Sequence, residues 1–180
     1  MRPRETPSVL SGYRVIELSS ERCALAGKLL ADMGAEVVVV EPPGGCTTRT
    51  WEPFAHDRPD KENGLHWWHY NTSKKSVVLD LDNEGEISKF RSLVLSADVV
   101  FVSEPVGRLD GLSADWKQLS RQNPELIWVS VTHHGRDGED PPSTDLTLLA
   151  EGGPVWSCGY DDHVIPPVRG GGNQGFHTAC

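Results

Sequence analysis

The chain has 180 residues, with 17 Lys and Arg against 26 Asp and Glu, and its net charge of −9 argues against a protein that coats nucleic acid. Its length suffices for one domain of ordinary size, and a content of 37% hydrophobic and 24% charged residues is typical of soluble globular proteins rather than of disordered ones. No apolar run approaches the roughly 20 residues that a bilayer span needs, so we expect no membrane partner.

The cysteines and the N-terminus indicate the cellular compartment. Cys23, Cys46, Cys158 and Cys180 are scattered and form no C-x-x-C motif, so neither a disulfide framework nor a zinc site is indicated. The first residues lack the apolar stretch of a signal peptide. We therefore expect a cytoplasmic protein with reduced thiols.

The first elements form a strand, a helix and a second strand. Tyr13–Leu18 alternates and is partly β-branched, which predicts a strand, and Cys23–Met33 carries apolar residues at helical spacing. Ser19–Glu21 is expected to cap this helix at its start, and Gly34 follows where a helix C-cap glycine belongs. Ala35–Glu41 is rich in valine, as strands buried on both faces are. The segment therefore predicts a βαβ unit.

The rest of the chain continues the alternation of strands and helices. The region from Pro42 to about His69 is predicted to be irregular, and from Gly135 onward glycine and proline replace the regular pattern. The further expected elements are a strand at Ser76–Leu81, a helix at Glu84–Leu95, a strand at Asp98–Val102, a helix at Ala114–Arg121 and a strand at Leu126–Val131. We therefore predict an α/β fold with an open, mainly parallel sheet and helices on both faces.

Several short motifs fail on context. Gly170–Gly175 matches G-x-G-x-x-G but does not follow the first strand, as a dinucleotide site requires. Asp80 opens a calcium-like loop whose twelfth position is Arg91, where a bidentate Glu is needed. The His66-x-x-His69 pair lacks the spacing of a metal-binding helix, and the adjacent His133 and His134 are expected to diverge. We predict no metal site.

A cluster of lysines and hydroxyl groups allows two interpretations. Asn71–Ser76 places Lys74 and Lys75 directly before a predicted strand, where lysine and hydroxyl groups together suit phosphate recognition. A solvated strand entry explains the same composition, and composition alone favours that simpler interpretation.

The order of several segments resembles one known family. The matching segments are Leu10–Leu18, Leu29–Gly45, Asn71–Leu81, Ala97–Val100, Gly111–Leu112, Asn123–Val131 and Pro166–Arg169. Together they resemble the N-terminal half of the class III CoA-transferases, the family of formyl-CoA transferase and carnitine CoA-transferase. The resemblance covers nearly the whole chain.

The resemblance implies a Rossmann-like domain that binds coenzyme A within a longer protein. On this basis residues 1–134 form the CoA-binding region, and residues 135–180 form a Gly/Pro-rich segment that leads into a truncated helix at Phe176. The large domain is then incomplete, and we expect a homodimer or a partner chain to complete it. The family moves CoA between carboxylic acids through an aspartate that attacks the acyl-CoA thioester. The implied substrates are acyl-CoA and a small carboxylic acid.

The carried-over CoA contacts lie in the turn after the first strand, in the lysine pair, and in the loops after the fourth and fifth strands. They are Ser20, Arg22, Lys74, Lys75, Ser103 and Gly135. Arg22 replaces a glutamine that is common in the family, and its guanidinium suits a CoA phosphate. The family's Glu-Asn-Phe after the fourth strand is replaced by the run from Val102 to Glu104.

The family's nucleophile is the largest departure. The run Gln174-Gly175-Phe176 corresponds to its Gln-Ala-Asp, so Phe176 stands at or next to the place of the aspartate, and a phenyl ring cannot form an acyl anhydride. Asp161 and Asp162 are interpreted as a solvated turn, so no catalytic residue is assigned. Two hypotheses remain: an acyl-CoA:carboxylate CoA-transferase, or an inactive or truncated relative that binds CoA or a partner subunit.

Overall fold

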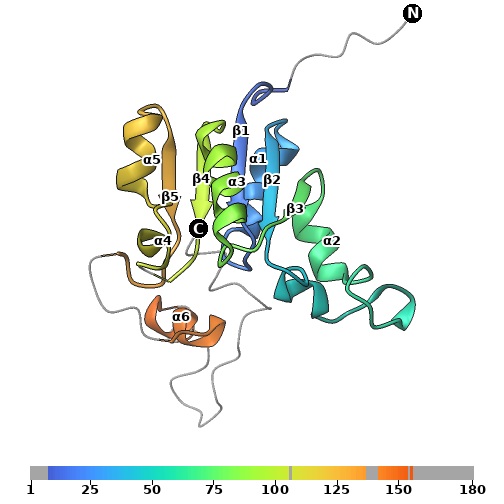
Figure 1. Cartoon of the computed structure of the whole chain (residues 1–180). Helices are drawn as coiled ribbons and strands as arrows, with labels where there is room; N and C mark the ends of the chain where they lie inside the picture. The colour runs from blue at the N-terminus through green and yellow to red at the C-terminus, as the bar shows by residue number, and fades with distance from the viewer. Residues whose placement is uncertain (1–7, 106, 137–141, 154, 156–180) are drawn as a thin grey trace, which may run out of the picture.

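The computed structural model describes residues 8–105, 107–136, 142–153 and 155 (Figure 1). The strands are β1 Arg14–Leu18, β2 Glu36–Glu41, β3 Lys75–Val78, β4 Val99–Val102 and β5 Ile127–Ser130. The α-helices are α1 Ala24–Asp32, α2 Leu65–Asn71, α3 Glu84–Leu95, α4 Arg108–Gly111, α5 Trp116–Gln122 and α6 Asp145–Glu151, and short 3-10 helices are η1 Thr47–Thr50 and η2 Ala55–Asp57.

All described strands pair in parallel in the order β3-β2-β1-β4-β5. The predicted parallel α/β sheet is therefore confirmed. The chain runs outward from β1 to β3 and then returns to place β4 on the other side of β1. The direction of winding reverses between β1 and β4, so the loops that follow these strands diverge at the carboxyl edge of the sheet. Such a reversal is where open α/β sheets leave a ligand crevice.

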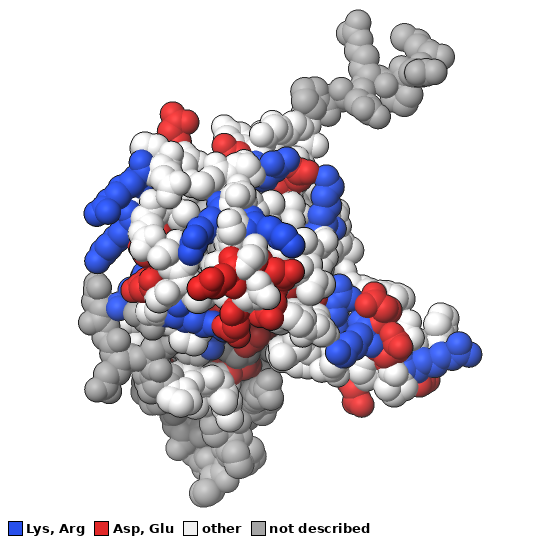
Figure 2. Space-filling model, in the orientation of Figure 1, with Lys and Arg blue, Asp and Glu red and all other residues white. Residues whose placement is uncertain are grey.

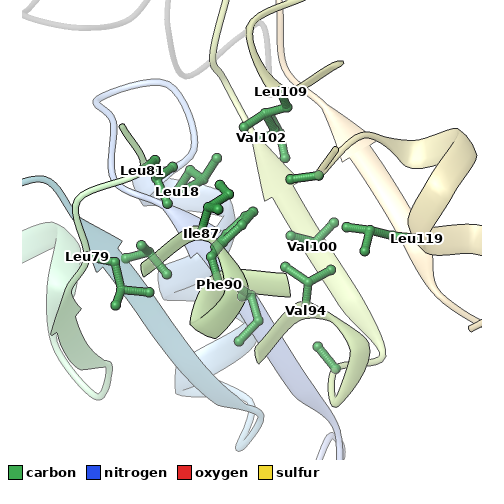
Figure 3. Close-up of a cluster of buried hydrophobic side chains, with 14 of the residues drawn as sticks. Leu18, Leu79, Leu81, Ile87, Phe90, Val94, Val100, Val102, Leu109 and Leu119 are labelled. Carbon is green, nitrogen blue, oxygen red and sulfur yellow. The ribbon is translucent and has the colours of Figure 1, made fainter. Parts of the chain in front are cut away.

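Alternating side chains along the strands divide the core into two layers. Ile16 and Val100 face α3 and α5, whereas Val15 and Val37 face α1 on the opposite side of the sheet (Figure 1). Figure 3 shows the larger layer, in which side chains of α3, among them Ile87 and Phe90, lie against those of the sheet. Helices therefore cover both faces, as predicted.

The predicted position of the first helix is confirmed within one residue at each end, whereas the residues predicted to cap its start are wrong. Cys23 is the N-cap of α1 and makes no side-chain cap hydrogen bond. Ser20 stabilises the turn before the helix instead, because its Oγ accepts a hydrogen bond of 3.0 Å from the Arg22 backbone N–H. Gly34 follows α1 with φ of 100°, a left-handed conformation that glycine adopts without steric cost.

Regular structure also occurs where none was predicted. The region that ends near His69 contains α2, and the Gly/Pro-rich segment contains α6. Helix α2 buries one residue, Trp67. A single buried residue gives no repeated apolar spacing by which a helix could be predicted from the sequence. Helix α6 begins with a capping box formed by Thr144 and Thr147, which is a local sequence feature that could have predicted the start of the helix. The helix expected at Phe176 lies outside the described residues.

Strand β3 is shorter than expected. It ends at Val78 rather than at Leu81, and it lies at the edge of the sheet. Leu79 and Leu81 are nevertheless buried in the larger core layer, so their apolar character reflects packing after the strand rather than the strand itself. Within the described residues, no helix is both long enough and apolar enough to cross a bilayer.

The core assignment predicts a difference between two identical leucine substitutions. Leu119 in α5 is fully buried, whereas Leu29 in α1 is 53% exposed. We expect Leu119→Ala to lower the free energy of unfolding by about 2–5 kcal/mol, because it leaves a cavity beside β4. Leu29→Ala should change it by less than about 0.5 kcal/mol. Urea denaturation of both variants tests this, and equal losses would contradict the assigned layers.

Candidate functional site

The loops at the carboxyl edge gather most of the residues predicted to contact CoA. Ser20 and Arg22 lie in the turn after β1, Ser103 follows β4, and Gly135 lies beyond the end of β5. The first three therefore flank the point where the winding of the sheet reverses. A cavity of about 150 Å³ opens at this edge. Ser19 from the turn after β1 lines it, whereas the four predicted residues at this edge lie beside its lining and not in it. We call this cavity the switch-point crevice.

The switch-point crevice carries charges of both signs. Asp80, Asp82, Glu104 and Arg108 line it. Arg108 lies 2.7 Å from a carboxylate oxygen of Glu104 and 3.5 Å from one of Asp82. Figure 2 shows Asp and Glu side chains gathered near the middle of one face, with Lys and Arg side chains around them. Sequence reasoning missed Arg108, although a cation soon after the predicted fourth strand was a usable signal.

Lys74 lies away from the open crevice, in a buried ion pair. Its Nζ donates hydrogen bonds to both carboxylate oxygens of Glu17, at 2.8 and 3.1 Å. It also donates to the backbone oxygen of Ala24 at 2.9 Å and to Oδ1 of Asn71 at 3.1 Å. The side chains of Lys74 and Glu17 are each 1% exposed. The ammonium therefore joins β1, α1 and the end of α2, and in this arrangement it reaches no solvent-exposed ligand.

Burial shifts the pKa values of both partners of this pair. Desolvation raises the pKa of the Glu17 carboxyl from 4.5 to about 7, and the attraction and hydrogen bonds of Lys74 only partly oppose it. Desolvation also lowers the pKa of Lys74, against the opposing effect of Glu17. Gly27 of α1 packs directly over the carboxylate, since a Cβ atom there would lie 1.7 Å from Oε2 of Glu17. The pair is thus enclosed by helix and sheet.

Lys75 lies apart from the other predicted site residues. Its Nζ is 2.6 Å from a carboxylate oxygen of Glu36 at the beginning of β2, and its side chain is 71% exposed. Glu36 also accepts a hydrogen bond of 2.7 Å from Nε of Arg14, at the start of β1. Hydrogen bonds from Lys75 and Arg14 lower the pKa of Glu36. This network joins the beginnings of three strands, at the edge opposite to Ser20 and Ser103.

A second buried carboxylate anchors the segment that connects β2 to β3. Glu41 ends β2 and is 1% exposed, and its two oxygens accept hydrogen bonds of 2.6 and 2.9 Å from Arg49. It also accepts hydrogen bonds from the hydroxyl of Ser76 and from the Cys46 backbone N–H. Burial acts to raise the pKa of Glu41, but these hydrogen bonds outweigh it and hold the pKa below its ordinary value. The guanidinium of Arg49 lies 4.0 Å from the ring centre of Trp67.

The histidines that suggested a metal have other neighbours. The His66 ring packs against Trp51 and Tyr70, at centroid distances of 4.9 and 4.7 Å. Nε2 of His134 lies 2.7 Å from a carboxylate oxygen of Glu151 in α6. Across the ranges that the structure describes, no three His, Cys, Asp or Glu side chains are grouped as metal ligands.

The buried pair predicts how stability depends on pH. Unfolded Glu17 loses its proton near pH 4.5, whereas folded Glu17 holds it until about pH 7, so the folded state binds more protons in this interval. The free energy of unfolding should therefore fall as the pH rises from 5 to 7.5, by up to about 3 kcal/mol. Urea denaturation at several pH values measures this slope. The double variant Glu17→Gln/Lys74→Met removes both charges and should lose it, so parallel profiles for the two proteins would refute the assignment.

Comparisons with known proteins find relatives that are named as CoA-transferases. The model of CoA-transferase family III matches residues 10–180. A subunit of succinyl-CoA:(R)-benzylsuccinate CoA-transferase from Thauera aromatica, BbsE, is 35% identical over 94% of this chain and 41% of its own length. Succinyl-CoA:mesaconate CoA-transferase from Haloarcula hispanica is 36% identical over 92% of this chain and 43% of its own length.

A solved structure agrees with the sequence matches. The crystal structure of Rv3272 from Mycobacterium tuberculosis superposes with a TM-score of 0.81 and 30% identity, over 97% of this chain and 49% of that one. The chain thus spans about two-fifths of the length of the curated relatives it matches and half of the solved one. The family match, the sequence identities and the shared fold agree with the resemblance in the sequence, and the chain belongs to CoA-transferase family III.

Proposed function

We propose that this chain takes part in the transfer of CoA between carboxylic acids, and that it binds CoA at the switch-point crevice. The family match along residues 10–180 carries the proposal. The relatives named above act on succinyl-CoA and dicarboxylic or aromatic acids, which supports an acyl-CoA and a small carboxylic acid as substrates. A cytoplasmic location suits such a protein, and Cys23 and Cys46, the cysteines among the described residues, form no disulfide.

The proposed CoA contacts are the residues that the fold brings to the carboxyl edge. The loops of Ser20, Ser103 and Gly135 offer backbone N–H groups and hydroxyl groups, and Arg22 offers a guanidinium for a phosphate. Lys74 takes the role of a positioning residue, because it fixes the first turn of α1 against β1 through Ala24 and Glu17. Lys75 is assigned no contact with CoA, since it lies at the opposite edge.

The second candidate function is CoA binding without transfer by this chain itself. Phe176 at or next to the place of the family's aspartate favours it, because no acyl anhydride forms on a phenyl ring. The Thauera relative is named as a subunit, which supports a protein whose partner chain completes the site. A homodimer that joins two such chains is the alternative assembly.

Calorimetry with CoA tests the proposed site. We expect CoA to bind the wild-type protein, and Ser19→Trp to weaken binding at least about tenfold, because the indole fills the cavity that Ser19 lines. Ser88→Trp on the exposed face of α3 is the matched control and should bind CoA as the wild type does. Unaltered CoA binding by Ser19→Trp would show that CoA does not bind at the switch-point crevice.

Mass spectrometry of thioesters separates the two candidate functions. The protein is incubated with succinyl-CoA and a panel of carboxylic acids, and new CoA thioesters of these acids are sought. New esters support transfer by this chain. CoA binding without new esters supports the second candidate, and the absence of both would refute the proposed function.

A further inference from the structure

The turn after β1 is bound on both sides by the same buried ammonium. Glu17 is the penultimate residue of β1, just before the turn, and Ala24 opens α1 directly after it. Nζ of Lys74 donates hydrogen bonds to the carboxylate of Glu17 at 2.8 Å and to the backbone oxygen of Ala24 at 2.9 Å. The buried pair of Glu17 and Lys74 therefore lies next to the backbone that carries Ser20 and Arg22, two of the proposed CoA contacts.

The carboxyl group of Glu17 depends on a single donor. Among the described residues its oxygens accept hydrogen bonds from Lys74 alone. Its neighbours on the adjoining strands, Val39 of β2 and Phe101 of β4, are apolar and buried, and Gly27 of α1 packs over it. One ammonium is thus what compensates the ionised carboxylate for its lost hydration, so a proton competes well with that ammonium.

The groups that surround the pair on α1 and α2 act on Lys74. Burial has the largest effect on the pKa of Lys74 and lowers it, and Glu17 opposes that effect most strongly. Cys23, the buried N-cap of α1, raises this pKa less, and Lys28 of the same helix lowers it further. From α2 the pair meets the amide of Asn71. Glu17, with a pKa of about 7, gains and loses its proton near neutral pH.

The protonation of Glu17 decides the net charge beneath the turn. When its carboxylate is ionised, the pair is neutral. When the carboxyl is protonated, the ammonium of Lys74 leaves one positive charge, which keeps its hydrogen bonds to Ala24 and Asn71. An anion bound beside the turn favours this positive state, because a nearby negative charge stabilises the ammonium and disfavours the carboxylate.

We propose that CoA binding beside the turn after β1 is linked to the uptake of a proton by the buried pair. The proton passes from solvent to a carboxylate oxygen of Glu17, and Lys74 keeps its charge. This inference rests on the proposed function, which brings a phosphate of CoA to Arg22. Because linkage is reciprocal, protonation strengthens CoA binding by the same factor by which CoA strengthens protonation. The pair therefore makes CoA binding tighter as the pH falls through 7.

Calorimetry with CoA tests this link. Titrations at pH 7 in two buffers of different ionisation enthalpy give the number of protons taken up for each CoA bound. Free Glu17 is about half protonated at this pH, so we expect the pair to take up at most about half a proton. A phosphate monoester titrates at roughly pH 6, so CoA itself also exchanges protons. Because this contribution is common to all variants, the test is the difference between them.

Two double variants separate the pair from other groups. Glu17→Gln/Lys74→Met removes both buried charges and should lose the proton uptake of the pair. The gain in CoA affinity from pH 8 to pH 6 should then be at least about threefold larger for the wild type than for this variant. The matched control is Glu36→Gln/Lys75→Met, which removes an exposed ion pair at the opposite edge of the sheet and should behave as the wild type does.

The single variant Glu17→Gln distinguishes a charge effect from a structural one. Its amide imitates the protonated carboxyl, and Lys74 keeps its acceptors on Ala24 and Asn71. At pH 8 we expect this variant to bind CoA at least about threefold more tightly than the wild type, because its positive charge is permanent. Loss of a merely structural contact would weaken binding instead. Far-UV circular dichroism at each pH confirms that each variant is folded.

The outcomes separate this inference from the proposed function. Equal proton uptake by the wild type and Glu17→Gln/Lys74→Met, or weaker CoA binding by Glu17→Gln at pH 8, would overturn the inference and leave the proposed CoA site intact. Absence of CoA binding by the wild type would refute the proposed function, and the inference with it. The pH dependence of stability checks the titration of Glu17 without CoA, and a slope unchanged by the double variant would also overturn the inference.

Discussion

The carboxyl group buried in the middle of this parallel sheet is paired with a cation, and the position of that cation constrains much of the fold. Glu17 lies on β1, the central strand, and Lys74 reaches it from the segment that precedes β3. The same ammonium binds the first turn of α1 and the last residue of α2. Removal of one partner of a buried pair typically costs about 3–5 kcal/mol, because the other group stays buried without its partner. One ion pair therefore sets the spacing of four elements.

The two buried glutamates show that burial alone does not decide protonation. Glu17 and Glu41 are each 1% exposed, yet the pKa of Glu17 is raised and that of Glu41 is lowered. Glu41 accepts hydrogen bonds from a guanidinium, a hydroxyl and a backbone N–H, whereas Glu17 has one ammonium as its partner. Desolvation prevails over Lys74 at Glu17, whereas at Glu41 the hydrogen bonds from Arg49, Ser76 and Cys46 outweigh it.

Sequence patterns predicted the architecture well and the side-chain environments poorly. The valines of β2 and the helical period of α3 are local signals, so the parallel sheet and its coverage by helices followed from them, whereas the strand order was not predicted. The burial of the Lys74 side chain depends on its contacts with Glu17 and Ala24. These residues lie far away in the sequence, so no local pattern predicts the contacts.

The segment that connects β2 to β3 is anchored near both of its ends by an ion pair. Arg49 binds Glu41 soon after β2 ends, and Lys74 binds Glu17 just before β3 begins. The ends of this segment are therefore fixed by the ion pairs and not by its length. Because the entropy of closing a loop grows only with the logarithm of its length, a doubling costs roughly 0.6 kcal/mol. The segment between the two ion pairs can therefore change in length and sequence during evolution while the sheet keeps its order.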